Sequence, residues 1–383
     1  MNSAKDAFGR LPLLLAFSLG SLGLLVLGVQ PLLYSAFVHE GLVSEARVGF
    51  LASTEIAAIA VGSLIGIALL RRVNQRFIAV GGFLLLILFS LMVETVPLFA
   101  ARALTGLGGG LLVAVAAFAI ADQARVNRAA GAFLLLQNIG QYAALKFLSG
   151  QAAALSGTQI LYALTCLYLI AVPFCLLLPK QAVKRISLET AEVRGAPPLA
   201  GIVALVASAL LVGAIIGIWA YMGLWLEQRG IDADQVAGFL SACMLGQMAG
   251  ALTAMWIGER GHSGRRILTM SGLMLLIVYG LYVSGDDAEL LFYLVIAFGL
   301  VWMITTPALT GLALDVDPSR RSLPYVAGAQ LAGAAIIPTL TGEIFASHGL
   351  DLVIAVSGVT VLASLGIVAL AVAMPKAAML PVA

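Results

Sequence analysis

Residues 96–121 read VPLFAARALTGLGGGLLVAVAAFAIA, and only one of them, Arg102, carries a charge. An α-helix needs about 20 mostly apolar residues to cross the hydrocarbon core of a lipid bilayer. The stretch is therefore predicted to be a membrane-spanning helix. Its single arginine and its cluster of glycines are features that a plain apolar span does not require.

The composition of the whole chain agrees with a membrane protein. Of its 383 residues 61% are hydrophobic and only 10% are charged, and the mean hydropathy is +1.06. Soluble domains average roughly 45–50% apolar and about 25% charged residues. This composition excludes a disordered chain and argues against a soluble α/β enzyme. A net charge of +2 without a basic patch argues against a nucleic-acid partner.

Other stretches have the length and apolar character of a membrane span. The first follows Lys5 and Arg10, but it is too long for the apolar core of a signal peptide, so we expect it to be retained as a helix. The twelve expected spans are residues 11–36, 46–70, 77–94, 96–121, 129–151, 157–178, 199–227, 234–258, 267–284, 289–315, 322–345 and 351–374.

The basic residues between these spans predict the orientation of the chain. All but four of the 21 basic residues lie in alternate loops, on one side of the membrane. The exceptions are Arg47 and Arg229 in loops of the other side, and Arg102 and Lys146 inside spans. Because basic loops stay in the cytoplasm, both termini are expected there, in a cell inner membrane or plasma membrane.

A polar segment divides the spans into two sets of six. Residues 179–198 read PKQAVKRISLETAEVRGAPP and are predicted to be a cytoplasmic linker between residues 1–178 and 199–383. A weak repeat with an offset of 190 residues aligns Gly82 with Gly272 and supports two related halves. We therefore expect an all-α protein with two six-helix bundles around a central cavity, as in transporters built from repeats.

The layout and one local motif together resemble the major facilitator superfamily of twelve-helix secondary transporters. Arg102, Gly106 and Gly110 fall on one face of the fourth span, as in the pattern of this family, and the glycines favour close packing of a neighbouring helix. Basic loops follow spans two and eight. The loop after span two departs from the family motif, with Leu70 and Val73 where an aspartate and a glycine usually stand.

Three ionisable residues lie inside spans of the first half, namely Glu55, Arg102 and Lys146. Charges inside a membrane are costly and are candidates for function. The resemblance implies that spans two and four are neighbours, so Glu55 and Arg102 are expected to approach each other. Structural alternatives exist: the two basic side chains can reach the outer headgroups, and Glu55 can be a protonated, hydrogen-bonded residue of the bundle.

Aromatic and amide side chains add candidate contacts for a substrate. They are Gln30 and Tyr34 in span one, beside Pro31, Gln141 in span five and Trp302 in span ten. A proline can free backbone groups in a spanning helix, and a break at Pro31 is expected to do so. We interpret Arg102 as the contact for an anion, Glu55 as the proton carrier and Lys146 as a secondary charge.

The resulting functional hypothesis is proton-coupled symport of a small organic anion, such as a mono- or aromatic carboxylate, by alternating access. Proton-coupled efflux of apolar or amphipathic compounds is the alternative, although span five lacks the glycine- and proline-rich pattern of drug antiporters. A sensor or a membrane-embedded enzyme is a third class, without a supporting motif. No cofactor or metal site is expected, a monomer suffices, and Cys166, Cys175 and Cys243 are interpreted as core residues.

Overall fold

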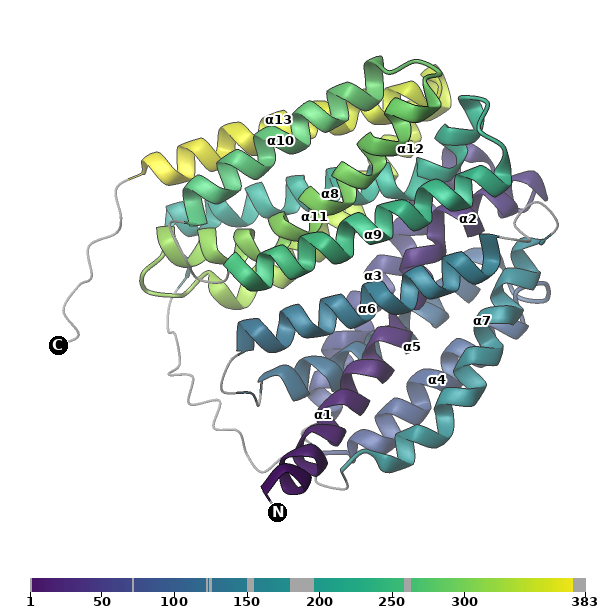
Figure 1. The fold of residues 1–383 in the computed structure, drawn as a ribbon, viewed down its shortest axis with the longest axis vertical. Coiled ribbons are helices and arrows are strands. Elements are labelled where there is room, and N and C mark those ends of the chain that lie inside the picture. The colour runs from purple at the N-terminus through teal and green to yellow at the C-terminus, as the bar shows by residue number, and fades with distance from the viewer. Residues whose placement is uncertain are drawn as a thin grey trace. The chain divides into compact units, whose positions relative to one another are not determined.

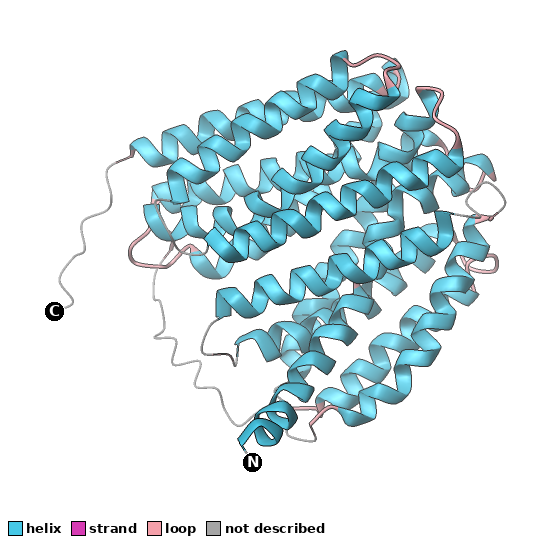
Figure 2. Cartoon of the chain, in the orientation of Figure 1, coloured by secondary structure: helices cyan, strands magenta, loops and turns pink. Residues whose placement is uncertain are grey.

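The computed structural model describes residues 2–70, 72–121, 123, 126–149, 155–179, 196–257 and 263–374. Within these ranges the chain is helical and contains no β-strand (Figures 1 and 2). The predicted linker 179–198 lies outside the described residues, except for its first residue and its last three.

Each of the twelve expected spans coincides with helix in the described part of the chain. The first corresponds to two consecutive helices, and the sixth ends in a short 3₁₀ helix. The α-helices are α1 (Asn2–Gly23), α2 (Leu25–His39), α3 (Val48–Leu70), α4 (Gln75–Leu91), α5 (Leu98–Ala121), α6 (Val126–Ser149), α7 (Gly157–Ala171), α8 (Leu199–Gln228), α9 (Ala233–Ile257), α10 (Ser263–Val283), α11 (Ala288–Val316), α12 (Val326–His348) and α13 (Asp351–Ala373). The 3₁₀ helices are η1 (Glu45–Arg47), η2 (Val172–Leu177) and η3 (Leu323–Tyr325).

Most of these helices have the length and apolar composition of a membrane span. Within the described residues, nine segments meet both criteria: Leu11–His39, Glu45–Leu70, Leu98–Ile120, Gly157–Leu177, Leu199–Gln228, Ala233–Ile257, Ser263–Val283, Ala288–Val316 and Asp351–Ala373. Helix α4 is a shorter apolar helix, and α6 and α12 are not among the nine. A protein that crosses the membrane many times follows from these segments.

The contacts divide the chain into two compact units. Unit 1 comprises Met1–Ser44, Thr54–Ile186 and Asp232–Met244, and unit 2 comprises Glu45–Ser53, Ser187–Ile231 and Leu245–Ala383. The division passes through α3 and α9, so each of these helices contributes residues to both units. The predicted arrangement of two contiguous six-helix halves around a central cavity stays a prediction.

The glycines of α5 allow three neighbouring helices of unit 1 to pack closely against it. A Cβ atom added at Gly106 or Gly110 would meet the backbone of α3, one added at Gly108 would meet α4, and one added at Gly109 would meet Gly23 of α1. The predicted close approach at Gly106 and Gly110 is therefore confirmed. A larger residue at either position would force α3 and α5 apart.

The interruption of the first span lies at Leu24, and α2 continues through Pro31. The expected break at Pro31 is therefore wrong. The Gln141 side chain of α6 donates a 2.8 Å hydrogen bond from Nε2 to the Leu24 carbonyl oxygen. The backbone N–H of Leu27 also donates to this carbonyl oxygen, over 3.1 Å, so the Leu24 carbonyl at the break accepts two hydrogen bonds.

Unit 2 is held together at its predicted outer end by charged and aromatic side chains. At the end of α8, Arg229 pairs with Asp351 of α13 at 2.5 Å, and its guanidinium lies 5.1 Å from the ring centre of Trp225. The Trp225 indole also donates to Asp351, over 3.1 Å. These contacts join the end of α8 to the beginning of α13.

Candidate functional site

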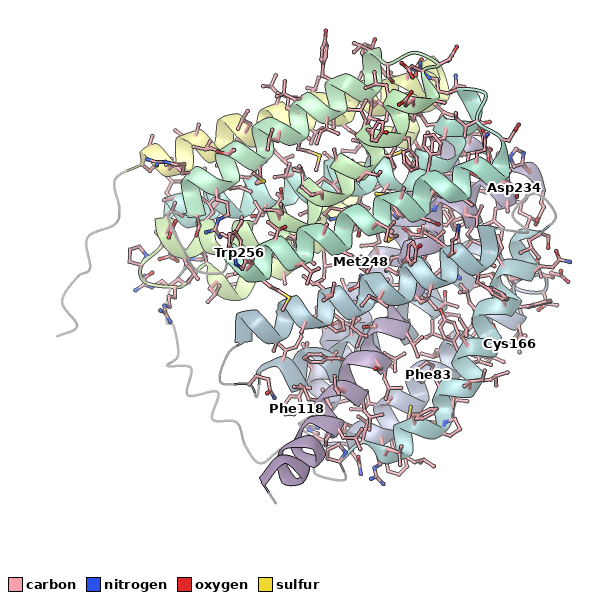
Figure 3. All side chains as sticks on the ribbon, in the orientation of Figure 1. Phe83, Phe118, Cys166, Asp234, Met248 and Trp256 are labelled. Atoms are coloured by element: carbon pink, nitrogen blue, oxygen red, sulfur yellow. The ribbon has the colours of Figure 1, made fainter. Side chains whose placement is uncertain are left out.

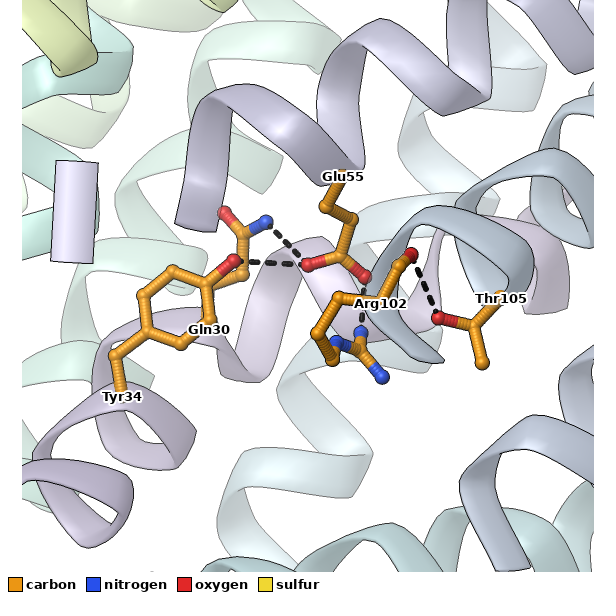
Figure 4. Close-up of polar contacts among 5 residues, drawn as sticks. All are labelled: Gln30, Tyr34, Glu55, Arg102 and Thr105. Carbon is orange, nitrogen blue, oxygen red and sulfur yellow. Dashed lines mark hydrogen bonds and ion pairs between the residues drawn. The ribbon is translucent and has the colours of Figure 1, made fainter. Parts of the chain in front are cut away.

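The centre of the candidate site is an ion pair between Glu55 of α3 and Arg102 of α5 (Figure 4). The Arg102 Nη2 atom donates to Glu55 Oε1, and 0% of Glu55 and 1% of Arg102 is exposed. Both residues lie inside apolar helices of membrane-spanning length. The predicted approach of these two residues is confirmed.

The second oxygen of Glu55 accepts hydrogen bonds from two residues of α2. Gln30 Nε2 donates to Oε2 over 3.1 Å and the Tyr34 hydroxyl donates over 2.8 Å. Gln30 and Tyr34 are four residues apart and therefore share one face of α2. Glu55 thus has donors on both oxygens, an arrangement that matches an ionised carboxylate, because a carboxylate only accepts.

The local sequence of α5 explains why the two charges meet. Gly106 lies one turn after Arg102, and a Cβ atom at Gly106 would stand 2.6 Å from the Glu55 carbonyl oxygen. The absence of a side chain therefore brings the backbone of α5 directly against the turn that carries Glu55. The Thr105 hydroxyl donates a 2.9 Å hydrogen bond to the Arg102 carbonyl oxygen within the same helix.

Besides the hydroxyls of Ser21 and Ser35, two buried nitrogen-bearing groups of unit 1 have no hydrogen-bond partner in the described part of the structure. They are the Nε atom of Arg102 and both amide atoms of Asn138, whose side chain in α6 is fully buried. A buried polar group without a partner costs about 1–3 kcal/mol, so such atoms are candidates for contact with a ligand or water. Sequence reasoning did not select Asn138, although an amide inside an apolar span was an available signal.

The other predicted contacts lie in different environments. Gln141 is engaged by the Leu24 carbonyl and packs on Gly28, while Lys146 is exposed in the last turns of α6. In unit 2, Trp302 is half-buried, and its ring lies 5.9 Å from the ring centres of Trp219 and Phe298. The structure thus joins Gln30, Tyr34, Glu55 and Arg102 in one network.

No metal centre is evident in the described residues, where no group of three histidine, cysteine or acidic side chains is placed to hold an ion. The interpretation of all three cysteines as core residues is wrong for one of them. Cys175 and Cys243 are buried, but Cys166 is exposed on α7 (Figure 3). An apolar helix of a membrane protein also has a face toward lipid, which composition alone does not separate from the core.

The sequence model of the Major Facilitator Superfamily matches residues 7–323 of the chain. The chain belongs to this superfamily. It is a transporter and not an enzyme, and it crosses the membrane several times. Among curated protein sequences, none matches the chain with significance.

Solved structures of transporters share the fold. One is a mutant of the nucleoside transporter NupG, with 15% sequence identity and a TM-score of 0.75 over 94% of this chain and 99% of that chain. Another is a bacterial homologue of the human lysosomal transporter Spinster, inward-facing and unoccupied. It has 14% identity and a TM-score of 0.69 over 94% of this chain and 96% of that chain. At these identities the likeness shows the fold alone.

Proposed function

We propose that this member of the superfamily couples the symport of a proton to that of a small organic anion. Glu55 carries the proton and Arg102 binds the substrate carboxylate. The observation that carries the proposal is the buried Glu55–Arg102 ion pair, in which Arg102 keeps one nitrogen, Nε, without a partner among the described atoms. A guanidinium presents several donors in one plane, so it suits a planar carboxylate.

The coupling follows from competition for Arg102. In the structure its charge is balanced by Glu55, so neither ion is left alone in the membrane. A substrate carboxylate that draws Arg102 toward itself leaves Glu55 as an ionised acid without a cation, which is costly in a buried site. Glu55 then binds a proton more readily. The anion and the proton are therefore taken up together.

The remaining candidate residues have supporting roles in this proposal. Trp302, with its ring half-buried beside Trp219, is a contact for an aromatic or apolar part of the substrate. Lys146, exposed in the last turns of α6, attracts anions on their way to Arg102. The protein works as a monomer in an inner or plasma membrane, with both termini in the cytoplasm.

The test is uptake into proteoliposomes that contain a pH-sensitive dye. Mono- and aromatic carboxylates are added outside, together with nucleosides, because a structurally similar protein is a nucleoside transporter. An accepted carboxylate should acidify the lumen and accumulate as labelled substrate. Arg102→Ala and Glu55→Gln should abolish the coupled signal, and Arg72→Ala, at an exposed loop residue, should retain it.

Other outcomes would redirect the assignment. Normal carboxylate uptake by Arg102→Ala contradicts the proposed substrate contact. Uptake of nucleosides without acidification contradicts both the anion and the proton. Proton-coupled efflux would appear in inverted vesicles as uptake. Accumulation of apolar compounds in inverted vesicles with an acidic lumen would therefore establish this alternative.

A further inference from the structure

We propose that Gln30 reverses its side-chain amide each time Glu55 gains or loses a proton. In the ionised state the amide nitrogen donates to Glu55, and in the protonated state the amide oxygen accepts from it. Gln30 is thus a positioning residue for the proton-transfer step. The inference rests on the proposed function, because it requires that Glu55 be protonated during the transport cycle.

The observed network suits only one protonation state of Glu55. Its three partners, Arg102, Gln30 and Tyr34, all donate to the carboxylate oxygens. Figure 4 shows the nitrogen of the Gln30 amide directed at Glu55 and the oxygen directed away. When a hydronium ion donates its proton to one carboxylate oxygen, an O–H bond of the hydronium breaks, an O–H bond of Glu55 forms, and a water molecule is left. The new O–H group then needs an acceptor.

The three partners differ in whether they can supply that acceptor. Arg102 has none, since a guanidinium carries only donors. The Tyr34 hydroxyl can accept, but its own hydrogen must then find a different acceptor. Gln30 carries an oxygen on the same terminal group as the donating nitrogen. Rotation about the last side-chain torsion, which is broad and roughly two-fold, exchanges the two atoms without moving the helix.

The groups that face Glu55 come from three packed helices. They are Gln30 and Tyr34 of α2, Arg102 of α5 and Tyr168 of α7, which is buried and within electrostatic range of both charges. None of these facing groups is a second acid. A proton that enters this network therefore goes to Glu55, and the amide of Gln30 is the group that can accommodate it.

Infrared difference spectroscopy between high and low pH tests the proposal directly. The wild-type protein in liposomes is labelled with ¹³C at the side-chain carbonyl of glutamine. We expect a carboxylic-acid band that is missing in Glu55→Gln, and with it a shifted labelled amide band. The amide shift should vanish in Gln30→Met. It should persist in the matched control Gln123→Met, whose glutamine binds the Ala119 carbonyl instead.

The pH profile of uptake separates this role from a structural one. Tyr34→Phe removes a donor to the carboxylate, so the pH of half-maximal uptake should rise. Gln30→Met removes one hydrogen bond from each protonation state, so its midpoint should move less than that of Tyr34→Phe. Its maximal rate should fall, because the proton then has no acceptor in the network.

The failures of the two proposals are distinguishable. A Glu55 acid band without a shift of the labelled amide overturns the role of Gln30 and leaves proton coupling intact. The absence of a Glu55 acid band in folded protein overturns both. The labelled wild type gives this answer even if Gln30→Met does not fold. If Gln30→Met shifts the pH of half-maximal uptake as much as Tyr34→Phe does, Gln30 acts only as a donor, and its proposed reversal is overturned.

Discussion

At the scale of single residues, Glu55 and Arg102 stabilise the protein only as a pair. Neither side chain reaches water, and each neutralises the other inside a helix of spanning length. Removal of one partner from a buried pair leaves an uncompensated charge and typically costs about 3–5 kcal/mol. Replacement of both by apolar residues is often neutral, because no charge then remains to be solvated.

A double-mutant cycle checks this interdependence. Arg102→Met and Glu55→Gln should each lower the melting temperature of the detergent-solubilised protein. The double variant should melt above both single variants, although it transports nothing. If the melting temperature of the double variant falls by as much as the two single decreases added together, the residues act independently and the ion pair does not stabilise the fold.

Part of this site follows from the sequence and part does not. Glu55 and Arg102 could be selected because charges are rare in apolar spans, and the family resemblance placed their helices side by side. The hydrogen bonds of Gln30 and Tyr34 to Glu55 depend on which face α2 turns to α3. The hydrophobicity of α2 is too uniform to fix that face. For the same reason, the sequence does not distinguish the exposed Lys146 from Gln141, which bonds to the Leu24 carbonyl, or from the buried Asn138, whose amide has no partner among the described residues.

At the scale of helices, the contact between α3 and α5 depends on glycine. An added Cβ atom at Gly110 would meet the backbone of α3 at Ile59. Gly110→Ala should therefore destabilise the protein by about 1–3 kcal/mol and slow transport, since α3 carries Glu55. Gly81→Ala, in α4 with open space around it, should be neutral or stabilise by up to about 1 kcal/mol. Thermal unfolding and uptake of the two variants give the comparison.

The turn after α11 is organised by a buried carboxylate outside the spans. Asp317 accepts hydrogen bonds from the backbone and hydroxyl groups of Ser319 and Ser322. Burial acts to raise the pKa of Asp317, but these hydrogen bonds outweigh it and hold the pKa below the ordinary value of 3.8. Because the folded-state pKa is lowered, the stabilisation is present above that value and is lost as the pH falls through the folded-state pKa.

Asp317→Asn should therefore melt at a lower temperature than the wild type at pH 7. Loss of charge-assisted hydrogen bonds corresponds to about 1.5–3 kcal/mol. The difference should narrow as the pH falls from 3.8 toward the folded-state pKa of Asp317, because the unfolded wild-type chain then binds a proton more readily than the folded protein. Thermal unfolding of the wild type and the variant at pH 7 and at pH 3 measures the stability difference at each pH. An equal difference at the two pH values would exclude the ionised carboxylate as the cause.

Hydropathy is sufficient to locate most helices in the sequence, but not the breaks within them. Helix lies at each of the twelve expected spans in the described residues, but only nine segments there have the length and apolar composition of a membrane span. The interruption at Leu24 was not predicted; there the Leu24 carbonyl oxygen accepts from Gln141 of another helix as well as from the Leu27 backbone. The break was expected at Pro31 instead, but α2 continues through this residue. Local sequence does not reveal a break that a distant residue stabilises.

At the scale of the molecule, the superfamily assignment shows a transporter that crosses the membrane several times, but not its orientation in the membrane. The alternation of basic loops predicts that Arg72 lies on the cytoplasmic side and Asp286 on the other side. Both are exposed loop residues. In a background without the exposed Cys166, Asp286→Cys should react with a membrane-impermeant maleimide on intact cells. Arg72→Cys should react only after permeabilisation, and the reverse pattern would invert the topology.

The substrate is not encoded at this scale. Structures of transporters with different names share this fold at 14–15% sequence identity, so the fold leaves chemical selectivity open. We expect selectivity to depend on a small number of polar atoms, and Arg102 Nε and the Asn138 amide are candidates because they have no hydrogen-bond partner among the described residues. Only the packed helices show that these buried atoms have no hydrogen-bond partner in the described part of the chain.

The neutrality of the Glu55–Arg102 pair also determines how the membrane voltage can act. Moving one elementary charge through 100 mV changes the free energy by about 2.3 kcal/mol. In the proposed symport cycle, the empty carrier would return with one negative and one positive charge at this site, and a loaded carrier would add one proton and one monovalent anion. Neither step moves net charge at the site, so voltage exerts no force on it. The pH gradient alone then sets the limit of accumulation, a tenfold ratio for each pH unit.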